Sequence, residues 1–106
     1  MKDVHEFWYQ QSIWSQETFG LDTERGPIGA LKHLAKEAVE AQMVPTDLEE
    51  YVDCLFLVFD ATRRAGYSFD DLLQGAFEKL EKNKRRVWPK PGPGDEPVEH
   101  VRGIHD

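Results

Sequence analysis

Four acidic residues fall in two pairs that share one spacing. Glu37 and Glu40 are three residues apart in LAKEAVEAQ. Glu50 and Asp53 repeat that spacing in LEEYVDCLF. Residues three apart on a helix project from nearly the same side, so two antiparallel helices with one pair each bring four carboxylates together. Such a cluster is costly unless a cation neutralises it, and the spacing therefore predicts a divalent-metal site.

The predicted ligands are carboxylate oxygens alone, which favours Mg²⁺ or Mn²⁺ over zinc. His33 lies four residues before Glu37, but a lone histidine there is more typical of capping or packing, so it stays outside the ligand set. Mg²⁺ held by carboxylates usually completes its shell with water and substrate phosphates, which indicates a polyphosphate site. Lys36, Lys79 and Arg86 are candidate phosphate contacts, with plain solvated surface as the alternative.

A solvated helix face is the simpler interpretation of two acids three residues apart. The second predicted helix does not decide between the two, because its apolar stripe leaves Glu37 and Glu40 on the other side. The third helix is apolar on the acidic side as well, where Cys54 and Leu57 accompany Asp53. We therefore expect that helix to be buried, and an unpaired Asp53 to be costly there.

Asp60 follows Asp53 by seven residues and lies nearly in line with it on a helix. It either extends the predicted metal site or pairs with an arginine, Arg63 or Arg64.

The chain is expected to be all-α, with no strand pattern of useful length and no internal repeat. Pro27 suits the first position of a helix, and Thr46 with Glu49 and Ser68 with Asp71 are spaced as capping boxes. Glycines at two positions suit helix C-termini. We expect helices at about 2–18, 27–43, 47 to 64 or 65, and 69–86, with Gly20 and Gly66 ending the first and third.

The last twenty residues are rich in proline and glycine, and they cannot continue a helix. We expect one domain over 1–106, with a helical core at about 2–86 and an extended tail at 87–106.

Composition narrows the function classes. Thirteen basic against twenty acidic side chains give a formal charge of −7, which argues against binding a nucleic-acid polymer or an anionic membrane. The single cysteine, Cys54, excludes a disulfide framework and suits a reducing compartment. The N-terminus lacks a signal pattern, and the longest apolar run, LFLVF, is too short to span a bilayer. We expect a soluble cytoplasmic protein.

The acid pairs and their context resemble the MazG-like branch of the all-α nucleoside triphosphate pyrophosphohydrolases. The resemblance covers nearly the whole chain, in the runs WSQETFG, GALKHLAKEAVEA, DLEEYVDCLFLVFDATRRAGYS and KLEKNKRRVWPKPGPGDEPVEHVRG. These runs are similar to small phage and bacterial members, some of which act on dATP and dGTP. Lys36 stands where others carry a further glutamate, and only nine residues separate Glu40 from Glu50, so the number of metal ions stays open.

The resemblance implies a four-helix MazG-like fold and a Mg²⁺-dependent enzyme. That enzyme would cleave a nucleoside triphosphate, dATP or dGTP, to the monophosphate and pyrophosphate through attack of a metal-activated water on the α-phosphorus. The ligands would be the four acids of the two pairs, and Glu37 or Glu40 would orient the water.

The resemblance also implies base contacts and assembly. Asn83 is a candidate to read a base edge, and Trp14 and Phe19 are candidates to stack on the base, with core packing as the alternative for Trp14. Members usually form dimers or dimers of dimers, so we expect a homodimer or homotetramer that completes the fold.

Two alternatives stay open. The first is an enzyme that acts on dUTP, dCTP or noncanonical nucleotides, since the sequence does not settle the base. The second is a noncatalytic helical interaction module, in which the acids form surface salt bridges with Lys79, Lys82 and Arg85.

Overall fold

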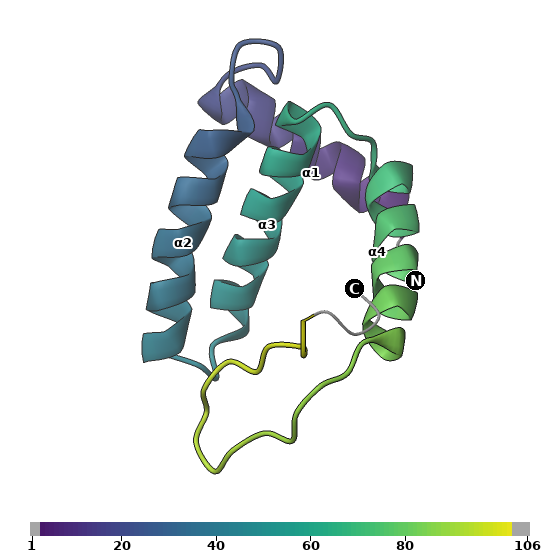
Figure 1. Cartoon of the computed structure of the whole chain (residues 1–106). Coiled ribbons are helices and arrows are strands. Elements are labelled where there is room, and N and C mark those ends of the chain that lie inside the picture. The colour runs from purple at the N-terminus through teal and green to yellow at the C-terminus, as the bar shows by residue number, and fades with distance from the viewer. Residues whose placement is uncertain (1–2, 103–106) are drawn as a thin grey trace. The chain divides into compact units, whose positions relative to one another are not determined.

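The computed structural model describes residues 3–102, and that part of the chain is helical apart from its loops and tail. The prediction of an all-α fold is confirmed. None of the helices within this range is long and apolar enough to cross a membrane. The predicted positions 2 and 103–106 lie outside the described residues. The four helices are α1 (Val4–Phe19), α2 (Pro27–Met43), α3 (Leu48–Arg64) and α4 (Phe69–Arg85), labelled in Figure 1.

The chain packs as two compact units, which divide between Leu72 and Leu73, inside α4. The first unit contains α1, α2, α3 and the start of α4, and the second contains the rest of α4 and the tail. The assignment of a single domain over 1–106 stays a prediction.

Most helix ends follow the predicted signals. Gly20 ends α1 with a φ of 109°, a conformation that glycine adopts without strain. At the start of α4, the Ser68 N–H donates to Asp71 Oδ2 at 2.9 Å and the Asp71 N–H donates to Ser68 Oγ at 3.1 Å, as a capping box requires. The predicted cap Thr46 is wrong by one residue. Asp47 caps α3 instead, because its carboxylate accepts the Glu49 N–H at 3.0 Å.

In the first unit, α2 and α3 run side by side in opposite directions (Figure 1). Helix α1 packs against α3 through aromatic side chains. Phe59 is the centre of this packing and is only 6% exposed. Its ring centroid lies 4.8 Å from that of Trp8, 5.8 Å from that of Phe7 and 6.0 Å from that of Phe69. These contacts hold one end of α3 against α1.

A buried arginine joins three segments of the first unit. The Arg63 guanidinium donates to Asp22 Oδ2 at 3.1 Å, to Gln11 Oε1 at 2.7 Å and to Asp60 Oδ1 at 2.6 Å. It also lies 5.7 Å from the ring centroid of Trp8. Because the Arg63 side chain is only 6% exposed, these bonds form a buried polar network that ties α1 and the loop after it to α3. Of the two alternatives for Asp60, the structure shows the arginine pair.

The predicted core stripes of α2 and α3 remain largely uncovered within the chain. Among the described hydrophobic residues, only Ala30, Phe59 and Ala61 are buried. Ile28 is 65% exposed and Leu48 is 73% exposed, although both lie on those stripes. The expectation that α3 is buried all round is therefore wrong for the single chain, because α1 and α2 both pack against α3 but leave Leu48, Tyr51 and Leu55 exposed.

In the second unit, the tail folds back on itself. The Val101 N–H donates to the Val87 carbonyl at 2.6 Å in an isolated antiparallel β-bridge. Trp88 Nε1 donates to the Asn83 carbonyl at 2.7 Å, and the Trp88 and His100 ring centroids lie 5.6 Å apart. The described part of the tail is thus non-helical, as predicted, but it closes into a loop.

Candidate functional site

The two antiparallel helices α2 and α3 bring three of the four predicted ligands together. Oxygen atoms of Glu37, Glu40 and Glu50 all lie within 4.8 Å of one another. Glu50 Oε2 is buried and accepts no hydrogen bond within the described residues. An orphaned, buried carboxylate oxygen beside two further carboxylates is unfavourable in the chain alone and suits a hard divalent cation.

The electrostatics of the cluster agree with this geometry. Partial burial raises the pKa of the Glu50 carboxyl, and the negative charges of Asp53 and of the two α2 glutamates raise it further. A side-chain hydrogen bond with Glu37 and then the repulsion between the two groups raise the pKa of Glu40. These carboxylates therefore resist full ionisation together, and the residues present fit a divalent cation.

Asp53 lies outside this group of three acids. It is exposed, so the expectation that burial would make its charge costly is not met in the single chain. Asp53 nevertheless lines the same cavity as Glu37. Its assignment as a metal ligand stays a prediction.

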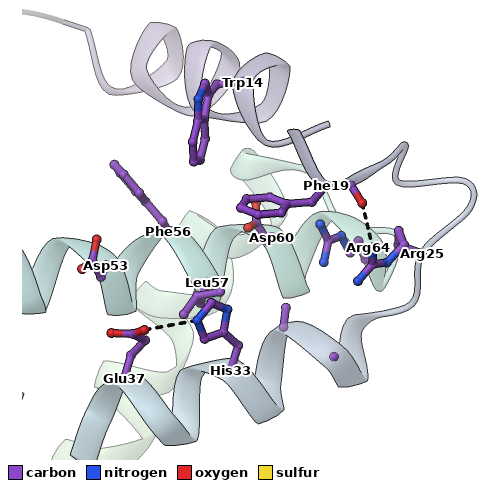
Figure 2. Close-up of a pocket in the computed structure, with 12 residues that line it drawn as sticks. Trp14, Phe19, Arg25, His33, Glu37, Asp53, Phe56, Leu57, Asp60 and Arg64 are labelled. Atoms are coloured by element: carbon purple, nitrogen blue, oxygen red, sulfur yellow. Dashed lines mark hydrogen bonds and ion pairs between the residues drawn. The ribbon is translucent and has the colours of Figure 1, made fainter. Parts of the chain in front are cut away.

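A cavity of about 250 Å³ opens beside the acids, between α1, α2 and α3. Glu37 and Asp53 lie at one end of it, and Figure 2 shows Arg25 and Arg64 at the other. Trp14 and Phe19 line it from α1, and the other lining residues are Gly29, Ala30, His33, Phe56, Leu57 and Asp60.

The two predicted stacking residues thus share a cavity with predicted metal ligands. The ring centroids of Trp14 and Phe19 lie 5.6 Å apart at an interplanar angle of 89°. Both side chains are roughly half exposed, so they are not buried packing residues in this chain. Flat rings at the edge of a cavity suit a planar ligand.

His33 holds one acid in place within the cavity. Its Nε2 lies 3.1 Å from Glu37 Oε1, one turn along α2, and Figure 2 draws this contact. The Glu37 side chain is 15% exposed, whereas that of His33 is 52% exposed. His33 was expected to be a capping or packing residue, but it orients a predicted ligand instead.

The predicted basic residues have different surroundings. Lys36 is exposed on α2, and its positive charge opposes the rise in the pKa of Glu40. Lys79, Asn83 and Arg86 belong to the second unit. Their roles stay predictions.

Lys79 and Asn83 lie one turn apart on α4, and Arg86 directly follows the end of that helix. Arg86 Nη1 donates to Asn83 Oδ1 at 3.1 Å, while Arg86 Nε is buried and makes no hydrogen bond within the described residues. Burial, the charge of Arg86 and that of Lys82 lower the pKa of Lys79. This side of the second unit is therefore basic, in contrast to the acidic cluster of the first.

Comparison with known proteins decides the family. The sequence model of the dATP/dGTP pyrophosphohydrolase family matches residues 8–105. The chain belongs to the dATP/dGTP pyrophosphohydrolase family. The family match includes all of α2, α3 and α4, and with them every predicted acid.

A curated relative of this family member is the Eaa protein of Salmonella phage P22, which is 48% identical over 93 residues. The matched segment is 88% of this chain and 28% of the phage protein, so the chain spans less than a third of the length of that relative. No solved structure matches the chain.

For this dATP/dGTP pyrophosphohydrolase family member, sequence reasoning placed Asp53, Leu57 and Asp60 along one side of α3 but missed that Arg64 continues the same wall of the cavity. Asp53, Leu57, Asp60 and Arg64 all line it from α3. Their spacing of four, three and four residues is that of one helical stripe, so the signal was present in the sequence. Arg25 was not identifiable in this way, because it comes from the loop between α1 and α2.

Proposed function

We propose that this chain is a Mg²⁺-dependent nucleotide pyrophosphohydrolase that converts dATP and dGTP to the monophosphate and pyrophosphate. Family membership supports the reaction class. The observation that carries the metal assignment is Glu50 Oε2, which is buried and unpartnered beside Glu37 and Glu40. A cavity with aromatic side chains adjoins these acids and offers space for the rest of a nucleotide.

In this proposal the four acids of the two pairs hold Mg²⁺, for which Mn²⁺ is a substitute. When bound, the cation offsets phosphate charge and lowers the pKa of water. In this proposal water attacks the α-phosphorus, and pyrophosphate is the leaving group. We assign the orientation of that water to Glu37 or Glu40, and His33 supports Glu37 through their 3.1 Å contact.

The remaining contacts follow the polarity of the cavity. The triphosphate lies at the acidic end with the cation, and the base lies toward Trp14 and Phe19, where flat rings favour stacking. Lys36 contacts phosphate, whereas phosphate contacts by Lys79 and Arg86 and a base contact by Asn83 stay predictions, because these three residues belong to the second unit.

We also propose that the chain works as a homodimer or homotetramer. The uncovered apolar side chains of α2 and α3 support this, because Ile28, Leu31, Leu48, Tyr51 and Leu55 are all at least 42% exposed. An apolar surface of this kind on two neighbouring helices is characteristic of a subunit interface.

The test is incubation of the purified chain with dATP, dGTP, dCTP, dTTP and dUTP, each with and without Mg²⁺. Chromatography then separates monophosphate plus pyrophosphate from diphosphate plus phosphate. We expect metal-dependent monophosphate from dGTP and dATP. Turnover of dUTP or dCTP alone would indicate the alternative substrates, and no turnover of any nucleotide would favour the noncatalytic module.

A pair of neighbouring substitutions tests the metal site within the same assay. Glu50→Gln removes the charge of the carboxylate that carries the buried oxygen. Glu49→Gln makes the same change on an exposed neighbour. We expect Glu50→Gln to abolish turnover and Glu49→Gln to retain it. Equal activity of the two variants would contradict the metal assignment.

A further inference from the structure

Arg64 is the one residue of the cavity wall with two buried side-chain donors that make no hydrogen bond within the described residues. Its side chain is 4% exposed, and the unpartnered donors are Nε and Nη2. The N–H bonds at these two positions point the same way from the planar guanidinium, so they form one fork. Arg64 lines the cavity beyond the edge of Phe19, as Figure 2 shows.

The surroundings of Arg64 do not satisfy this fork. Asp22 Oδ1 lies 3.7 Å from Nε, which is an ion-pair distance but too long for a hydrogen bond, and this oxygen accepts no hydrogen bond within the described residues. Asp22 Oδ2 is held by Arg63 Nε, which donates to it at 3.1 Å, and Arg64 Nη2 has no ion-pair partner in the described part of the chain. Burial of a charged donor without an acceptor is unfavourable, so the fork suits a ligand with two acceptors side by side.

The position of Arg64 indicates which part of a nucleotide supplies those acceptors. Arg64 lies at the end of the cavity opposite Glu37 and Asp53. A triphosphate bound with a cation belongs at the acidic end, so the base lies toward Arg64. Of the bases, guanine carries two neighbouring acceptors, O6 and N7, that match an arginine fork.

We propose that Arg64 reads the O6 and N7 edge of a purine base, so that the chain prefers guanine over adenine and both over pyrimidines. This inference rests on the proposed function for the kind of ligand. Adenine shares N7 but presents an amino donor in place of O6, opposite a guanidinium that also only donates. Cytosine and thymine lack N7 altogether.

Nucleotide analogues test the proposal on the unaltered chain. We compare kcat/KM for dGTP, dITP, dATP and 7-deaza-dGTP. dITP keeps O6 and N7 but lacks the 2-amino group, and we expect it to match dGTP. We expect dATP and 7-deaza-dGTP to be about tenfold or more poorer, since each loses one acceptor of the pair. If dITP behaves like dATP, the 2-amino group is being read and the proposal is wrong.

Substitutions at Arg64 give an independent test. Arg64→Met removes the fork, and Arg64→Lys keeps the charge without the fork, so both are expected to reduce the preference for dGTP over dCTP. Arg85→Met makes the same change on exposed α4 and serves as the control, with the preference retained. An equal loss of kcat/KM for dGTP and for dCTP would mean that Arg64 contacts phosphate, and this would overturn the proposal.

Binding of the monophosphates separates this inference from the proposed function. Calorimetry measures dGMP against dAMP without added metal, for the unaltered chain and for Arg64→Lys. A preference for dGMP that depends on Arg64 supports the inference even if no triphosphate is hydrolysed. If hydrolysis occurs but neither turnover nor binding distinguishes guanine from adenine, the inference fails and the proposed function stands.

Discussion

His33 and Glu37 are joined across one turn of α2 by a 3.1 Å contact between Nε2 and Oε1. The contact directs the Glu37 carboxylate toward the other acids, so the geometry of the cluster depends on a residue outside it. We expect His33→Ala to lower kcat about tenfold, because loss of a hydrogen bond that orients a ligand typically costs that much. Partial recovery in His33→Gln, which retains a donor, would distinguish orientation from loss of fold. Full activity of His33→Ala would contradict the role.

The acid cluster is expected to destabilise the fold without metal and to stabilise it when Mg²⁺ is bound. Glu50→Gln removes one charge from a crowded group with an orphaned oxygen, so without metal this variant should melt at a higher temperature than the unaltered chain. Added Mg²⁺ should then raise the melting temperature of the unaltered chain only. Thermal unfolding with EDTA and with Mg²⁺ measures both effects. A similar rise in Glu50→Gln would place the cation elsewhere.

Asp60 should make the fold sensitive to acid. Burial alone would raise the pKa of its carboxyl, but the hydrogen bond from Gln11, the nearby Ser15 hydroxyl and the pair with Arg63 outweigh burial. The pKa is lowered from its ordinary value of 3.8. A lowered pKa stabilises the fold above pH 3.8, and this contribution is lost as the pH falls through the pKa of the folded state.

Asp60→Asn tests this relation by urea unfolding at several pH values. At pH 7 we expect a loss of about 3 kcal/mol in the free energy of unfolding, because Arg63 loses one of its two charged partners and keeps only Asp22. The variant should lose less stability than the unaltered chain between pH 5 and pH 3. Parallel acid profiles for the two proteins would contradict the assignment.

The exposed apolar residues of α3 predict that a charge placed among them disrupts the proposed oligomer. Leu55 is 42% exposed in the single chain, and a glutamate there would put a charge in the proposed interface. We expect Leu55→Glu to shift the chain toward a monomer in light scattering after gel filtration. Tyr67→Glu alters an exposed side chain beyond α3, and the mass should stay that of the unaltered assembly. A monomeric unaltered chain would exclude the proposed oligomer.

Local signals predicted the helices well because the residues at their ends act on their own backbone. Pro27 and Met43 bound α2 as expected, and proline at a first helical position needs no distant partner. The error at the start of α3 is equally local. Asp47 and Thr46 are both good caps, and the aspartate carboxylate, which also favours a helix N-terminus electrostatically, takes the position.

Burial was less predictable because it depends on partners that periodicity does not name. Leu48 belongs to a regular apolar stripe, yet it is 73% exposed because no element of the described chain covers it. The acids show the same division. The spacing brought Glu37, Glu40 and Glu50 together, whereas the exposure of Asp53 follows from where α1 crosses α3. The spacing along α3 could also have placed Arg64 on the cavity wall, but the two unpartnered donors of its side chain depend on the tertiary structure and leave no sequence pattern.

The three hydrogen bonds of Arg63 also bear on how fast a ligand enters. They fix Asp22, in the loop that connects α1 to α2, and that loop carries Arg25 at the rim of the cavity. The wall is therefore formed during folding, and a ligand that arrives does not have to order it. Association should follow a single exponential whose rate rises linearly with ligand concentration, without the plateau that a slow opening step imposes.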